Sequence, residues 1–169
     1  VDEESSVRFF STLIDTLGSA GYEHYEISNF CRSAMYSRHN TSYWRGVPYL
    51  GCGPSAHSFN TDTREWNVSS LEDYIHSIEN NHRRFESEYL DLVTRYNECI
   101  MTSIRTQWGL SLNEIEQNFG KELWKYCMDM ALPHLNSGKL GMHNDRLRLT
   151  RKGIFVSDGI MSDLMFVEE

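Results

Sequence analysis

A short segment, "SRHNTSYWRG" at positions 37–46, gathers side chains that can bind a ligand. His39, Asn40, Tyr43 and Trp44 lie close together in it, between two arginines. An imidazole can ligate a metal ion, and the rings of Tyr and Trp offer flat apolar area with a polar edge. The residue types alone leave two interpretations open: a ligand site, or a strand and turn that bury their rings.

Two neighbouring motifs also carry candidate residues. Glu26 lies in "GYEHYEISNF" at 21–30, where it can be a structural hydrogen-bond partner or a cofactor contact. Gly51 and Gly53 lie in "YLGCGPSAHSF" at 49–59. Glycines let a backbone approach a ligand closely, and they also form tight turns. Both alternatives stay open for each motif at this point.

The composition restricts the class of protein. The chain has 169 residues and a formal net charge of -8, which opposes nonspecific binding to nucleic acid because that binding relies on Lys and Arg. No apolar run approaches the ~20 residues that span a bilayer, so we expect no transmembrane segment. Cys31, Cys52, Cys99 and Cys127 are far apart, as free thiols of a cytoplasmic protein would be. From the N-terminal residues we expect this chain to be a piece cut from a longer protein.

The first half of the chain has the pattern of an α/β layer. Apolar spacing predicts a helix over 7–17, and the aromatic run 22–30 predicts a strand. Glycine and proline interrupt the segment 38–68, which we expect to form loops and short strands. Ser69 and Glu72 have the spacing of a capping box and predict a helix over 71–78.

The second half is predicted to be mainly helical. Apolar residues predict a long helix over 90–108, and Ser111 and Glu114 form a second capping box before a helix that ends near Gly120. A further helix, a hairpin with "HND" as its turn, and a closing helix follow. This order predicts a winged-helix-like domain. We place the domain boundary between residues 87 and 88.

Four motifs in order resemble one known family. They are "GYEHYEISNF" (21–30), "SRHNTSYW" (37–44), "YLGCGPSAHSF" (49–59) and "REWNV" (64–68). Together they resemble the HemW branch of the radical-SAM family that also contains oxygen-independent coproporphyrinogen III oxidase, HemN. The resemblance implies a partial (β/α) barrel that carries a [4Fe-4S] cluster and S-adenosylmethionine, followed by a winged-helix-like domain. Residues 1–87 would then be the C-terminal portion of the barrel, and 88–169 the domain after it.

The resemblance also implies roles for the candidate residues. His39, Asn40, Tyr43 and Trp44 match the pattern HNxxYW, which is associated with haem chaperones, so the resemblance implies haem binding there with His39 as the iron ligand. It places the loop with Gly51 and Gly53 near S-adenosylmethionine. Glu26 keeps both alternatives, a structural hydrogen-bond partner or a cofactor contact. The loop departs from the usual LGLGPGAHS of the family, because Cys52 and Ser55 replace an apolar residue and a glycine. We expect Cys52 to fill a small buried space.

The motif for the cluster is not found in these residues. The family binds its cluster through CxxxCxxC, a spacing that the sequence lacks, so we expect this chain by itself to perform no radical chemistry. Three functions remain open: a haem chaperone that delivers haem to client haemoproteins, an oxygen-independent coproporphyrinogen III oxidase, and a winged-helix nucleic-acid or protein-binding module. The charge balance makes nucleic acid the weakest of these partners.

Overall fold

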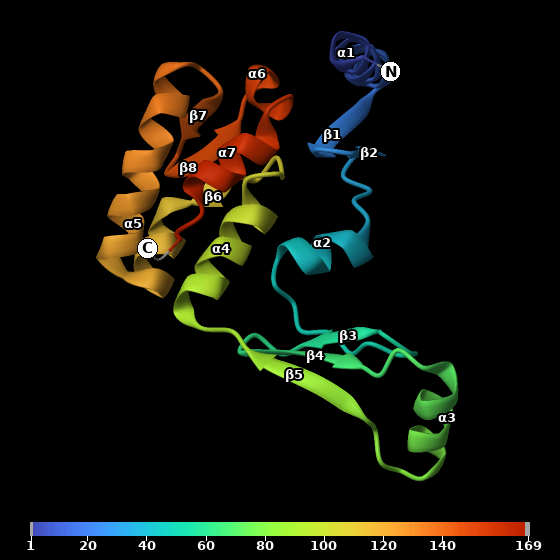
Figure 1. The fold of residues 1–169 in the computed structure, drawn as a ribbon. Helices are drawn as coiled ribbons and strands as arrows, with labels where there is room; N and C mark the ends of the chain where they lie inside the picture. Colours follow the sequence, from blue (N-terminus) through green and yellow to red (C-terminus); the bar gives the residue numbers. More distant parts are fainter. Residues whose placement is uncertain (1, 168–169) are drawn as a thin grey trace. The chain divides into compact units, whose positions relative to one another are not determined.

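The structure is a computed structural model that describes residues 2–167, and contacts divide them into two compact units (Figure 1). The first unit joins the residues up to Trp44 with those from Tyr96 onward, and the second is Arg45–Arg95. We describe each unit by itself. The predicted boundary between residues 87 and 88 concerns family domains, and it stays a prediction.

The first unit begins with a helix, a hairpin and a short helix. Helix α1 (Glu3–Ser19) starts at Asp2, whose side chain accepts a hydrogen bond from the Ser5 amide at 2.8 Å. Strands β1 (Tyr22–Glu26) and β2 (Asn29–Arg32) pair antiparallel. The single strand predicted over 22–30 is therefore wrong, because the chain reverses at residues 27 and 28.

Helix α2 (Arg38–Trp44) contains the first motif of the sequence analysis. The expectation that loops and short strands fill the whole segment 38–68 is wrong at this point. Apolar side chains are too few in seven residues to show a helical period, since such a pattern needs a window of about 11 residues or more.

The second unit contains one antiparallel sheet and one helix. Its strands are β3 (His57–Phe59), β4 (Thr63–Asn67) and β5 (Phe85–Tyr89), in that spatial order. Helix α3 (Leu71–Glu79) begins at Ser70 and not at Ser69, since the Ser70 side chain accepts the Asp73 amide. All five residues of β5 are exposed. The sequence analysis missed this strand, because apolar side chains occur only at the two ends of FESEY.

The C-terminal part has helices around a hairpin, as predicted. The predicted single closing helix is wrong, because the chain forms α6 (Arg151–Ile154) and α7 (Ser157–Leu164), which residues 155 and 156 separate. Strands β7 (Leu140–His143) and β8 (Arg146–Leu149) are joined by Asn144 and Asp145, both with positive φ, as a two-residue hairpin turn requires. Gly120, with φ 87° and ψ 171°, breaks α5 (Leu112–Asn136) into two helices at the predicted place. The elements are α4 (Leu92–Ser103), β6 (Leu110–Ser111), α5 (Leu112–Asn136), β7 (Leu140–His143), β8 (Arg146–Leu149), α6 (Arg151–Ile154) and α7 (Ser157–Leu164).

The apolar core of the described residues lies in this C-terminal part. Tyr96, Ile100, Ile115 and Leu147 are each fully buried in it. The Tyr96 hydroxyl donates to the Leu164 carbonyl oxygen at 2.9 Å, which satisfies its one polar group. Among residues 2–167, no helix combines the length and the apolar composition needed to cross a membrane.

Candidate functional site

Helix α2 has an exposed face that carries two of the four motif residues. His39 and Tyr43 are both exposed, and their ring centroids are 4.9 Å apart with the ring planes at 90°. Residues four positions apart lie on the same face of a helix, so the HxxxY spacing places the two rings side by side. The exposed face of α2 thus presents the imidazole of His39 beside the phenol of Tyr43.

The adjacent face of α2 is turned toward the hairpin. Asn40 and Trp44 are both half-buried. The Asn40 Nδ2 atom donates to Asn29 Oδ1 at 3.4 Å, and the Trp44 ring meets the Tyr25 ring edge-on at 5.9 Å. These two motif residues therefore hold the helix in place, while His39 remains accessible.

Tyr25 anchors the start of α2 as well. Its side chain is only 2% exposed, and its hydroxyl accepts the Ser37 amide at 3.2 Å, one residue before the helix. The rings of Tyr36 and Trp108 pack against it. Gln107 donates two hydrogen bonds to this group of rings. Its backbone N–H donates to the Tyr25 carbonyl oxygen at 2.9 Å, and its Nε2 donates to the Tyr36 hydroxyl at 3.1 Å.

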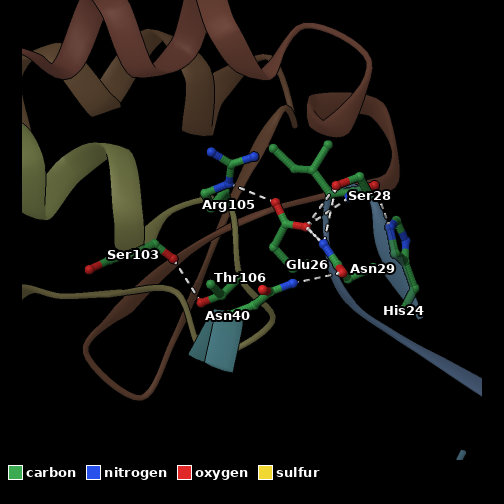
Figure 2. Close-up of polar contacts among 9 residues, drawn as sticks. His24, Glu26, Ser28, Asn29, Asn40, Ser103, Arg105 and Thr106 are labelled. Atoms are coloured by element: carbon green, nitrogen blue, oxygen red, sulfur yellow. Dashed lines mark hydrogen bonds and ion pairs between the residues drawn. The ribbon is translucent and has the colours of Figure 1, made fainter. Parts of the chain in front are cut away.

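Glu26, at the end of β1, is the centre of a polar network beneath α2 (Figure 2). Its side chain is 1% exposed. The Oε1 atom accepts Arg105 Nε at 2.6 Å, and Oε2 accepts the amide and hydroxyl of Ser28 at 3.0 Å each, together with Asn29 Nδ2. We call Glu26, Ser28, Asn29, Asn40 and Arg105 the Glu26 network.

The Glu26 network keeps its carboxyl group ionised. Burial raises the pKa of Glu26, but the hydrogen bonds from Asn29, Ser28 and Arg105 outweigh it and bring the pKa below its usual value. The carboxylate can then only accept hydrogen bonds. Both of its oxygens are engaged by donors of the chain itself, which supports the structural interpretation of Glu26, and its cofactor contact stays a prediction.

The glycine loop of the second unit is held by another buried polar side chain. Asn67, 2% exposed, donates from Nδ2 to the carbonyl oxygens of Gly53 at 2.8 Å and Gly51 at 3.3 Å. A Cβ on Gly51 would come within 2.1 Å of the His57 carbonyl oxygen. This close approach is to the chain's own backbone, and contact of either glycine with S-adenosylmethionine stays a prediction.

The two departures from the family's usual loop differ in their consequences. Cys52 is exposed, so the expectation of a buried filler is wrong. Ser55 has φ 57°, in the left-handed region where a residue with a Cβ is strained. The family's usual glycine at this position would adopt that conformation without strain.

A [4Fe-4S] cluster does not fit the residues described in this chain. Over residues 2–167, no group of three or more His, Cys, Asp or Glu side chains could hold a metal ion. Cys31 and Cys127 are buried, and burial raises the pKa of the Cys127 thiol to about 11. A thiol with a raised pKa is a poor source of the thiolate that iron binds.

Comparison with known proteins finds relatives of this chain. Residues 90–156 match the HemN C-terminal domain family. The heme chaperone HemW of Mycobacterium tuberculosis is 32% identical over 155 residues, covering 90% of this chain and 38% of that protein. The HemW of Lactococcus lactis is 23% identical over 163 residues, covering 96% and 43%. The chain is a relative of the HemW and HemN proteins. The resemblance predicted from the four motifs is confirmed.

The likeness to HemN extends to the fold. The solved structure of coproporphyrinogen III oxidase (HemN) from Escherichia coli matches with a TM-score of 0.68 and 17% identity, over 92% of this chain and 39% of that one. This confirms the predicted mixed α/β fold. The chain spans about two fifths of the length of these HemW and HemN proteins.

Two arginines, one in β8 and one in α6, have their positive charge neutralised by ion pairs. Arg146 pairs with Glu114 at 3.1 Å, and Arg151 pairs with Asp15 of α1 at 3.0 Å. Paired guanidinium groups are less available to phosphates, and the absence of a nucleic-acid partner stays a prediction.

Sequence reasoning missed the residues that support α2 from within the HemN C-terminal domain. Arg105, Gln107 and Trp108 were expected to continue the long helix, but α4 ends at Ser103. Residues 105–107 instead bond to the end of β1, where the Ile27 amide donates to the Arg105 carbonyl at 3.1 Å. The run "RTQW" of polar and aromatic residues directly after an apolar helix face was the available signal.

Proposed function

We propose that α2 is the haem-contacting helix of a haem chaperone, with His39 as the ligand of the haem iron and Tyr43 beside the porphyrin. One observation carries this proposal: the motif divides into the exposed pair His39 and Tyr43 and the anchoring pair Asn40 and Trp44. A helix that only stabilised the fold would gain little from exposing two rings. The relatives named heme chaperone HemW support the same function.

The exposed pair has the chemistry that haem requires. A neutral imidazole is a common axial ligand of haem iron, and a phenol ring adds apolar area with a polar edge. Arg38, also exposed at the start of α2, has the fork of donors that pairs with a propionate. Asn40 and Trp44 contribute by fixing the direction of the helix.

The activity of the whole protein follows as part of this proposal. It binds haem and delivers it to client haemoproteins, while a [4Fe-4S] cluster and S-adenosylmethionine have a supporting role. The cluster would be held by residues outside this chain. We place the protein in the reducing cytoplasm, where the four cysteines stay as thiols.

The alternative function is that of an oxygen-independent coproporphyrinogen III oxidase. The likeness to HemN at 17% identity concerns the fold alone and does not favour this activity. Oxidative decarboxylation of coproporphyrinogen by the protein with its cluster reconstituted would support the oxidase and count against the chaperone.

The decisive experiment is a haem titration followed by absorption. We expect a shifted Soret band on binding, and His39→Ala should weaken binding and change the band. The matched control is His76→Ala, since His76 is also an exposed histidine in a helix, α3. Equal haem binding and equal spectra for the two variants would remove His39 as the ligand.

A further inference from the structure

The support of α2 depends on the orientation of one side-chain amide. Asn29 uses both ends of its amide, because Nδ2 donates to Glu26 Oε2 and Oδ1 accepts from Asn40 Nδ2 at 3.4 Å (Figure 2). An ionised carboxylate has only acceptors, so it can bond to Asn29 only through Nδ2. The oxygen of the amide is thereby left to face α2.

The carboxylate itself is oriented from the HemN C-terminal domain. Arg105 Nε bonds Glu26 Oε1 at 2.6 Å, while Ser28 occupies Oε2 with two donors. Each oxygen therefore has its own donors, and the carboxylate plane is determined. The chain of hydrogen bonds runs from Arg105 through Glu26 and Asn29 to Asn40, which adjoins His39 in sequence.

We propose that Glu26 is a positioning residue for α2: its charge orients the Asn29 amide, and through Asn40 it holds the helix that exposes His39 and Tyr43. The network thus couples residue 105 of the HemN C-terminal domain to the haem-contacting face. The part that concerns haem rests on the proposed function. The positioning of α2 does not, so it can be tested in the haem-free protein.

The competing explanation is that Glu26 merely neutralises Arg105 and stabilises the fold. The two explanations differ for Glu26→Gln, which keeps the size of the side chain and adds an NH2 group. Gln has one acceptor oxygen where the carboxylate has two, so its NH2 group must face the donors either of Arg105 or of Ser28 and Asn29. If it faces Arg105, the bond to the C-terminal domain is lost. If it faces Asn29, that amide must turn to present Oδ1, and Nδ2 would then face Nδ2 of Asn40, which loses its acceptor.

The experiment is amide hydrogen exchange of residues 38–44 without haem. We expect Glu26→Gln to speed exchange in α2 about tenfold, because a hydrogen bond to a charged group is lost from its support. The matched control is Glu114→Gln, which removes the carboxylate that pairs with Arg146 at 3.1 Å in the same unit. This control should leave exchange in α2 unchanged.

A double substitution tests the orientation of the amide directly. Asn29→Asp alone sets two carboxylates side by side and should loosen α2, while Glu26→Gln with Asn29→Asp restores a donor at position 26 facing an acceptor at position 29. We expect the double variant to exchange more slowly in α2 than either single variant. Additive effects, or exchange in Glu26→Gln equal to that in Glu114→Gln, would overturn the proposal.

A milder variant covers the case in which substitutions at Glu26 prevent folding. Asn40→Asp keeps Glu26 and Asn29 and presents an acceptor to Asn29 Oδ1, so it should loosen α2 while the exchange of β1 stays unchanged. Faster amide exchange in both β1 and α2 would show that Asn40 stabilises the whole hairpin. That result would overturn the proposal that the network positions α2. The haem titration of His39→Ala decides the proposed function separately, because none of the exchange measurements contains haem.

Discussion

In the C-terminal domain, side chains such as Ile100 and Leu147 are fully buried in an apolar core, whereas the residues buried beneath α2 and the glycine loop include Glu26 and Asn67. Apolar burial is nondirectional and scales with area. A buried polar group must instead meet specific partners in specific directions. The domain core thus supplies the apolar burial that stabilises the fold, whereas Glu26 and Asn67 supply directional hydrogen bonds, which we infer orient the motif segments.

The largest expected effect tests the apolar side of this comparison. Ile100→Ala should lower the free energy of unfolding by about 2 to 5 kcal/mol, because it removes a fully buried side chain and leaves a cavity. Urea denaturation followed by circular dichroism measures this loss. The neighbouring Met101→Ala, at a side chain that is 45% exposed, should cost about 0.5 kcal/mol. Similar losses for the two variants would contradict the position of the core.

The second effect concerns the charge of Glu26. The pKa of Glu26 is lowered in the folded protein, so its contribution is present above the pKa of the unfolded chain, about 4.3, and is lost as the pH falls. Glu26→Gln should cost about 1.5 to 3 kcal/mol at pH 7. The difference from the wild type should shrink as the pH falls below about 4. Urea denaturation as a function of pH measures it, and a difference that does not change with pH would rule out the charge as its cause.

The third effect sharpens the comparison at the glycine loop. Asn67→Asp replaces the donor that faces the carbonyl oxygens of Gly51 and Gly53 with an acceptor, and should cost about 1 to 3 kcal/mol at pH 7. Protonation of the introduced carboxyl group restores a donor, so the loss should decrease at acidic pH. Asn118→Asp, at an exposed amide in α5, is the control. An equal loss in both variants would contradict the role of Asn67.

The smallest effect has the opposite sign. Ser55→Gly should raise the free energy of unfolding by about 0.5 kcal/mol, because it relieves a left-handed conformation at φ 57°. Thermal denaturation of the two proteins measures the change. Ser162→Gly, inside α7, should instead destabilise by about 0.5 kcal/mol, since glycine is a poor helix former. A loss of stability in Ser55→Gly would mean that position 55 is not strained.

Much of the C-terminal fold was predictable from local patterns. The apolar period of α4, the cap at Ser111, the break at Gly120 and the turn at residues 144–145 each act over a few residues, and all four are present. The end of α4 was not predictable, because Ile104 and Trp108 continue the apolar spacing, while Arg105 and Trp108 find partners on the hairpin.

The candidate site was predicted in its residues but not in its arrangement. The sequence by itself determined that His39, Asn40, Tyr43 and Trp44 belong together, because spacing is a property of the chain. Only the tertiary structure decided that two of them face outward and two inward. This arrangement depends on Tyr25 and Asn29, which contact α2, and on Arg105, which pairs with Glu26 from 79 residues further along the chain. No local sequence pattern specifies these partners.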